Sequence, residues 1–168
     1  MSLTPTRHQS REFVFLSLAL VILGADQLTK FLVRNHMAVG ESIPESWFIR
    51  ITYIQNTGGA FGLFANQTIF LTIAAIIGIC VIGYFFIRGS RFRFVLRLSL
   101  ALQMGGALGN VIDRLTFGYV IDFIDIRVWP IFNVADSSIT IGFFLLVWTL
   151  IMGSDRKGKN RYGSKSQK

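Results

Sequence analysis

Residues 69–87 read IFLTIAAIIGICVIGYFFI, a run of 19 residues that contains no charged side chain. A helix of about 20 apolar residues is long enough to cross the hydrocarbon core of a bilayer. Largely apolar stretches of similar length occur at 13–33, 94–112 and 135–153. The whole chain of 168 residues is 52% hydrophobic and 15% charged, which is more apolar than is usual for a soluble domain. The sequence therefore predicts a mainly α-helical membrane protein with four spanning helices.

The distribution of charge predicts how these helices are oriented. Twelve of the 17 basic residues lie in three places. They precede the first span, lie in or just after the connection between the second and third spans, or follow the fourth span. Because Lys and Arg are enriched on the cytoplasmic side of membrane proteins, both termini are predicted to be cytoplasmic. This topology explains the net charge of +8 without nucleic-acid binding. The twelve residues are Arg7, Arg11, Arg88, Arg91, Arg93, Arg97, Arg156, Lys157, Lys159, Arg161, Lys165 and Lys168.

The chain length fits one domain, which we place at residues 1–154, followed by a basic tail at 155–168. The tail is predicted to be disordered and close to anionic lipid. The first span follows Arg7 and Arg11, as a signal peptide would. It is longer than the usual apolar region of about 7–15 residues and lacks an Ala-x-Ala cleavage site, so we expect it to be retained. The single cysteine, Cys80, excludes an intrachain disulfide framework and is interpreted as a small apolar residue.

The first outer connection contains a predicted β region at about 40–66. Residues 47–55 (WFIRITYIQ) are rich in aromatic and β-branched side chains, which predicts a strand. Residues 56–59 (NTGG) are typical of a turn. We expect a small platform on the outer surface, with Trp47 and Phe61 near the lipid headgroups.

Several ionisable residues fall in predicted spans, where an unpaired charge is costly. Asp26 and Lys30 are four residues apart and share one helix face, which favours an ion pair that tethers the helix. A direct chemical role is the alternative. Asn110, Asp113 and Arg114 lie within about one turn at the outer end of the third span. They either form hydrogen bonds and ion pairs with one another, or they hold a substrate through the planar guanidinium of Arg114.

Two aspartates, Asp122 and Asp136, are the candidates for chemistry. Asp122 lies in an apolar segment, which would raise its pKa. Asp136 precedes Ser137 at the start of the fourth span, where it could equally be the helix N-cap. Both belong to the outer surface, and two carboxyls brought close together share a proton. Such a pair supplies a general base and a general acid, which can hydrolyse an amide with water and without a metal or organic cofactor.

Other catalytic machinery has little support in the sequence. The two histidines are His8, on the cytoplasmic side, and His36, in the outer connection. The zinc-peptidase motif H-E-x-x-H and the serine motif G-x-S-x-G are both missing from the sequence. The G-x-G-D sequence of presenilin-type proteases is missing as well.

The chain resembles the bacterial lipoprotein signal peptidases, the aspartyl signal peptidase II family, over essentially its whole length. Five blocks in order on a four-span scaffold make the resemblance specific. A small departure is Gly59, where many members have another residue. The blocks are DQLTK at 26–30, NTGGAFG at 56–62, GGALGNVIDR at 105–114, VIDFI at 120–124 and FNVAD at 132–136.

The resemblance implies an endopeptidase of the bacterial inner membrane that cleaves prolipoproteins just before the diacylglyceryl-modified cysteine. It implies an outer β-cradle, a short helix or loop over the active site around 113–134, and inhibition by globomycin. Asp122 and Asp136 match the catalytic dyad. Residues that match the substrate pocket are Asn56, Asn110, Arg114, Asn133 and Ala135, and those that match supporting positions are Asp26, Lys30 and Asp113. The partners would be lipid-modified signal peptides and membrane lipids.

Two other functions remain open from the residues alone. A small proton-coupled transporter would use the same carboxyls as a relay, but it predicts an internal repeat and acids near the bilayer midplane. A non-enzymatic membrane scaffold would use every acid as a cap or a structural pair. It predicts that function survives the loss of both Asp122 and Asp136.

Overall fold

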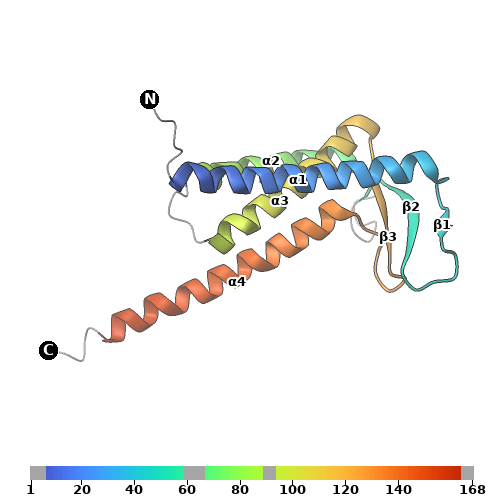
Figure 1. The fold of residues 1–168 in the computed structure, drawn as a ribbon. Helices are drawn as coiled ribbons and strands as arrows, with labels where there is room; N and C mark the ends of the chain where they lie inside the picture. The colour runs from blue at the N-terminus through green and yellow to red at the C-terminus, as the bar shows by residue number, and fades with distance from the viewer. Residues whose placement is uncertain (1–6, 59–66, 89–93, 164–168) are drawn as a thin grey trace.

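The computed structural model describes residues 7–58, 67–88 and 94–163, which form four helices and three strands (Figure 1). Each helix contains a stretch that is long and apolar enough to cross a membrane, so the predicted four-span architecture is confirmed. The elements are α1 (Arg7–His36), β1 (Ser42–Ile43), β2 (Arg50–Asn56), α2 (Thr68–Arg88), α3 (Phe94–Phe117), β3 (Val120–Asp125) and α4 (Val134–Gly163).

Two helices, α3 and α4, end at least five residues later than the sequence predicts. α3 runs to Phe117 rather than to residue 112, because the polar side chain of Asp113 is buried and finds partners inside the protein. α4 runs to Gly163, past the predicted end of the fourth span at residue 153. Lys and Arg are good helix formers, and each residue added to an existing helix gains one backbone hydrogen bond.

The helices form an elongated bundle from which the far end of α4 diverges, with the sheet at one end and the start of α1 and the end of α4 at the other (Figure 1). α3 is central and packs against α1, α2 and α4. Glycines allow this close packing: a Cβ at Gly105 would lie 2.6 Å from the carbonyl oxygen of Ala19, and one at Gly106 would lie 2.5 Å from that of Ala135. Small residues have this role between membrane helices.

The sheet is antiparallel, with the order β1–β2–β3 in the described residues. Ser42 pairs with Thr52, and Ile54 pairs with Asp122. The strand predicted at 47–55 is confirmed only from Arg50 onward, and it extends to Asn56. Residues 47–49 are outside it because β3 ends at Asp125, which pairs with Arg50, and β1 reaches only Ile51 and Thr52.

An apolar cluster docks the sheet onto the helices. Val33 of α1 packs with Tyr53 of β2 and with Ile121 and Phe123 of β3, and all four side chains are buried. Because Asp122 lies between two of these residues, the cluster fixes the strand that carries it. After β3 the described chain reaches α4 through a loop, residues 126–133, without a helix. The resemblance implies a short helix or a loop over the active site, and at residues 126–133 the structure has a loop.

Candidate active site

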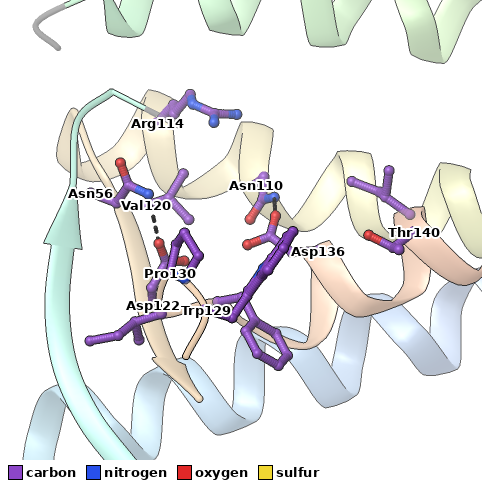
Figure 2. A pocket seen from close by; sticks show the side chains of 12 residues that line it. Asn56, Asn110, Arg114, Val120, Asp122, Trp129, Pro130, Asp136 and Thr140 are labelled. Carbon is purple, nitrogen blue, oxygen red and sulfur yellow. Dashed lines mark hydrogen bonds between the residues drawn. The ribbon is translucent and has the colours of Figure 1, made fainter. Parts of the chain in front are cut away.

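A cavity of about 230 Å³ lies at the sheet end of the bundle, between α3, α4, β2 and β3 (Figure 2). Asp122 reaches it from β3 and Asp136 from the first turn of α4. The polar residues Asn56, Asn110 and Arg114 line the same space. Its apolar wall comes mainly from the loop before α4 and from α4 itself, with Val120, Trp129, Pro130, Ile131, Phe132 and Ile139.

Asp122 is 1% exposed and is held by two amides. Asn56 Nδ2 donates to its Oδ2 at 2.7 Å, and Asn133 Nδ2 donates to its Oδ1 at 2.7 Å. Burial raises the pKa of Asp122 to about 7, and the nearby charge of Asp136 acts in the same direction. A pKa in this range lets the carboxyl hold or release a proton near neutral pH.

Asp136 is not the N-cap of α4, and this alternative from the sequence is wrong. The helix begins at Val134, and Asn133 Oδ1 accepts a hydrogen bond from the backbone N–H of Asp136 at 2.8 Å. Asn133 is therefore the cap, and Asp136 is the third residue of the helix. Its own carboxylate is left to face the cavity, where Oδ1 accepts from Asn110 Nδ2 at 2.8 Å.

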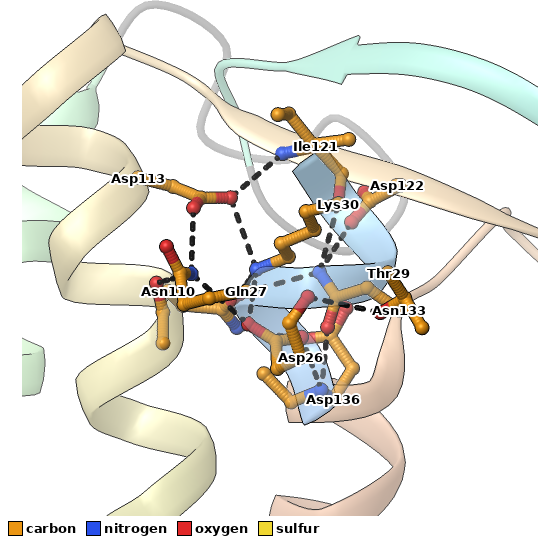
Figure 3. A network of polar contacts seen from close by, with 12 residues as sticks. Asp26, Gln27, Thr29, Lys30, Asn110, Asp113, Ile121, Asp122, Asn133 and Asp136 are labelled. Atoms are coloured by element: carbon orange, nitrogen blue, oxygen red, sulfur yellow. Dashed lines mark hydrogen bonds and ion pairs between the residues drawn. The ribbon is translucent and has the colours of Figure 1, made fainter. Parts of the chain in front are cut away.

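Lys30 lies behind the cavity at the centre of a buried polar network (Figure 3). Its Nζ contacts Asp26 Oδ2 at 2.8 Å, Asp113 Oδ2 at 3.0 Å and Asn110 Oδ1 at 2.9 Å. An ammonium group has three donors, so each has one acceptor. The ion pair predicted between Asp26 and Lys30 is present, and Asp113 is a second carboxyl partner that their spacing did not reveal.

The two carboxyls of this network also hold backbone next to the candidate dyad. Asp26 Oδ1 accepts from the N–H of Ala135, and Asp113 Oδ2 accepts from the N–H of Ile121. Each bond thus fixes the residue that precedes one of the two aspartates. Every buried side-chain polar atom in the described part of the chain has a hydrogen-bond partner.

The structure brings most of the residues singled out in the sequence together, although in two groups. Asn56, Asn110 and Arg114 line the cavity with the aspartates. Asn133 and Ala135 are fully buried behind it, so their side chains support the site and do not line it. In the described residues, no three His, Cys, Asp or Glu side chains are arranged to hold a metal ion.

Gln27 belongs to the site and was missed in the sequence. Its Nε2 donates to Asp113 Oδ1 at 3.0 Å and to the carbonyl oxygen of Gly109 at 3.2 Å, so it bridges α1 and α3. The available signal was its position between Asp26 and Lys30. An uncharged amide gives no electrostatic reason to single it out, because burying it costs little once it is hydrogen-bonded.

Gly109→Ala is expected to destabilise the protein by about 1–3 kcal/mol and to reduce activity, because overpacking a tight contact forces its neighbours apart. The added Cβ would collide with Asp26 Oδ2, the atom that pairs with Lys30. Thermal unfolding in detergent measures the effect. Gly24→Ala on α1 is the matched control, since nothing lies within 4 Å of its Cβ position. Equal stability of the two variants would contradict the expected contact.

The fold and the cavity together define a multi-pass membrane protein with paired carboxyls at one end of its bundle. The family model described as Signal peptidase (SPase) II matches residues 18–152. The chain belongs to the signal peptidase II family and is a membrane protease.

Similar proteins cover nearly the same length. The lipoprotein signal peptidase of Moorella thermoacetica is 45% identical over 148 residues, which are 86% of this chain and 97% of the relative. That of Pelotomaculum thermopropionicum is 46% identical over 153 residues, which are 88% of this chain and 97% of the relative. A solved structure of a bacterial membrane enzyme superposes with a TM-score of 0.79 at 36% identity and covers 86% of this chain and 91% of that chain.

Proposed function

We propose that this protein is an aspartic endopeptidase that removes signal peptides from prolipoproteins by cleaving before the diacylglyceryl-modified cysteine. The observation that carries the proposal is the cavity into which Asp122 and Asp136 reach from different elements, each carboxylate held by an amide. Both aspartates match the catalytic dyad that the sequence resemblance implies. The names of the relatives support the substrate class.

The pair can hydrolyse an amide if it holds one proton. The ionised carboxylate takes a proton from water as the water oxygen attacks the carbonyl carbon, and the protonated carboxyl donates to the carbonyl oxygen. When the C–N bond breaks, the leaving nitrogen takes a proton from the carboxyl that received it from water. Arg114 lines the cavity beside both aspartates, so its guanidinium can hold substrate carbonyl oxygens.

A second, apolar cavity of about 530 Å³ fits a lipidated substrate. It lies between α2, α3 and α4, lined by residues such as Leu100, Leu146 and Leu150. This second cavity is farther from the sheet than the first, along α3 and α4, which line both. The apolar part of a signal peptide can therefore lie along the bundle while its end enters the site. Two acyl chains hold such a substrate in the bilayer at about 0.8 kcal/mol per buried CH₂.

The positions of the charges favour one membrane orientation. The sheet end is proposed to be outside the bacterial inner membrane, and both termini inside, by the excess of basic residues at the other end. Trp47 is 68% exposed at the sheet end, where an aromatic side chain can lie at the headgroups. Globomycin-type inhibitors are proposed to occupy the cavity between the two aspartates.

Purified protein in lipid vesicles tests the proposal with a synthetic prolipoprotein peptide whose cysteine carries a diacylglyceryl group. We expect one cut, with the modified cysteine as the new N-terminus, identified by mass spectrometry. The matched control is the same peptide with an unmodified cysteine, which we expect to be cleaved far more slowly. Failure to cut the lipidated peptide, or cutting both peptides at equal rates, would contradict the proposal.

The pH dependence of cleavage follows from the proton on Asp122. Since the pKa of Asp122 is raised to about 7, it loses its proton as the pH rises through 7, and the pair then holds two charges and no proton. We expect kcat/KM to fall about tenfold per pH unit above that point. A stopped assay between pH 5 and 9 on a substrate without titrating groups measures it. A constant rate up to pH 9 would contradict this prediction.

A further inference from the structure

The two carboxyls of the site are held by different kinds of donor. Asp136 is linked to a charge: Lys30 Nζ donates to Asn110 Oδ1 at 2.9 Å, and Asn110 Nδ2 donates to Asp136 Oδ1 at 2.8 Å. An amide whose oxygen binds an ammonium group has a more polarised N–H, because hydrogen bonds in a chain strengthen one another. Asp136 is also in the first turn of α4, where the helix dipole favours an anion.

Asp122 also feels the charge of Lys30, but no donor of Asp122 has its own amide oxygen bound to that ammonium. Its two donors are the neutral amides of Asn56 and Asn133, and it lies in a strand, which has only a small net dipole. The side-chain oxygen of Asn133 accepts from the backbone N–H of Asp136. Asn133 is therefore unlike Asn110, whose side-chain oxygen accepts from the ammonium group of Lys30. Burial opposes the anion at both positions, and the donors and the helix dipole compensate for it better at Asp136 than at Asp122.

The remaining charged groups around the pair do not cancel this difference. Asp26 and Lys30 face it from α1, and Asp113 and Arg114 face it from α3. Asp26 and Asp113 both bind Lys30 directly, so their charges are largely balanced by the ammonium. Arg114 interacts with both Asp136 and Asp122. Asn110 donates a hydrogen bond to Asp136 and not to Asp122. Its Oδ1 also accepts from Asn133 Nδ2 at 3.2 Å, the nitrogen that binds Asp122, but there Lys30 and Asn133 share one acceptor and the ammonium does not polarise the Asn133 N–H.

We infer that Lys30 is a positioning residue that acts through Asn110 to keep Asp136 ionised, so that Asp136 is the general base and Asp122 the general acid. The inference rests on the proposed function and assigns the two roles within it. Asp136 takes the proton from water as the new C–O bond forms, and Asp122 gives its proton to the carbonyl oxygen. As the C–N bond breaks, Asp136 passes its proton to the leaving nitrogen, and the proton on the former carbonyl oxygen returns to Asp122.

Paired variants test this assignment through the pH profile of kcat/KM. Asn110→Ala removes the link between Lys30 and Asp136, so we expect the acid limb to move to higher pH by about one unit, the shift expected on losing a hydrogen bond to a charged group. Asn56→Ala removes one donor to Asp122 and is expected to move the alkaline limb upward while the acid limb stays. A general loss of structure would lower the rate without separating the limbs. The opposite pattern, or an unmoved acid limb in Asn110→Ala, would overturn the inference.

A second measurement titrates the unaltered protein, needs no cleavage, and uses variants only to assign the signals. Aspartate labelled with ¹³C at Cγ reports ionisation by NMR, and the signals that disappear in Asp122→Asn and Asp136→Asn identify the two groups. We expect the Asp136 signal to be that of a carboxylate at pH 6 and the Asp122 signal to be that of a carboxylic acid. The reverse order would overturn the inference. The titration would stand even if the peptide were not cleaved, so failure of the proposed function is distinguished from failure of this assignment.

Discussion

Asp122→Asn and Asp136→Asn are each expected to lower kcat for cleavage of the lipidated peptide by about 10²- to 10⁴-fold, the range that acid–base groups contribute. Asparagine has the shape of the carboxyl group but neither takes nor gives a proton at neutral pH. Oδ1 of an asparagine at 136 would still accept from Asn110, so the variant should keep its fold. Mass spectrometry of the products measures the loss of catalysis, and thermal unfolding of the same samples shows whether stability is lost as well.

Asp125→Asn is the matched control for this prediction. Asp125 lies in the same strand and is 4% exposed, but it binds Arg50 and Thr52 on the other side of the sheet from the cavity. We expect its activity to stay within a few-fold of the unaltered protein. Turnover near the unaltered level in either dyad variant would eliminate the aspartic mechanism.

Lys30→Met is expected to cost about 3–5 kcal/mol of stability, the usual effect of removing one partner from a buried ion pair. The change would leave Asp26 and Asp113, both at most 1% exposed, without their shared cation. Thermal unfolding in detergent, followed by tryptophan fluorescence, measures the loss. If the protein does not accumulate in the membrane, a protease-protection assay of the expressed chain shows the same effect.

Two comparisons make the Lys30 prediction specific. Arg50→Met removes the cation of the Arg50–Asp125 pair, in which Arg50 is 24% exposed and lies outside the spans. It should cost less than Lys30→Met, because Asp125 keeps its hydrogen bonds from Thr52 and from the backbone N–H of Arg127. Asp26→Asn combined with Lys30→Met removes one of the stranded carboxylates but keeps the oxygen that accepts from Ala135, so it should recover part of the loss. A stable Lys30→Met protein, or a double variant less stable than Lys30→Met alone, would contradict the prediction.

The spanning helices could be predicted because membrane burial needs only length and apolar character. Asp26 and Lys30 were paired correctly because four residues separate them on one helix. Their other contacts could not be read from spacing: Asp113 and Asn110 come from α3, about 80 residues along the chain. Gln27 was missed because it carries no charge.

The second half of the site was harder to predict for two physical reasons. Strand β3 has buried residues on both faces, so it lacks the alternation that identifies a half-exposed strand. At the start of α4, the residues Asn133, Asp136 and Ser137 are all favoured N-caps. Asn133 has that role because its Nδ2 also binds Asp122, a contact between elements that local sequence does not contain.

The bond from Ala135 N to Asp26 Oδ1 joins residues that are 109 positions apart, and it has a consequence for the order of synthesis. A ribosome makes the first helix long before the last, and Asp26 can enter the bilayer already neutralised by Lys30 within that helix. The carboxyl of Asp136 and the cap that orients it arrive only with the fourth helix. The nascent chain therefore has no complete pair of aspartates until its fourth helix has been translated. By the proposed mechanism, it is then unable to cleave neighbouring chains while it is being made.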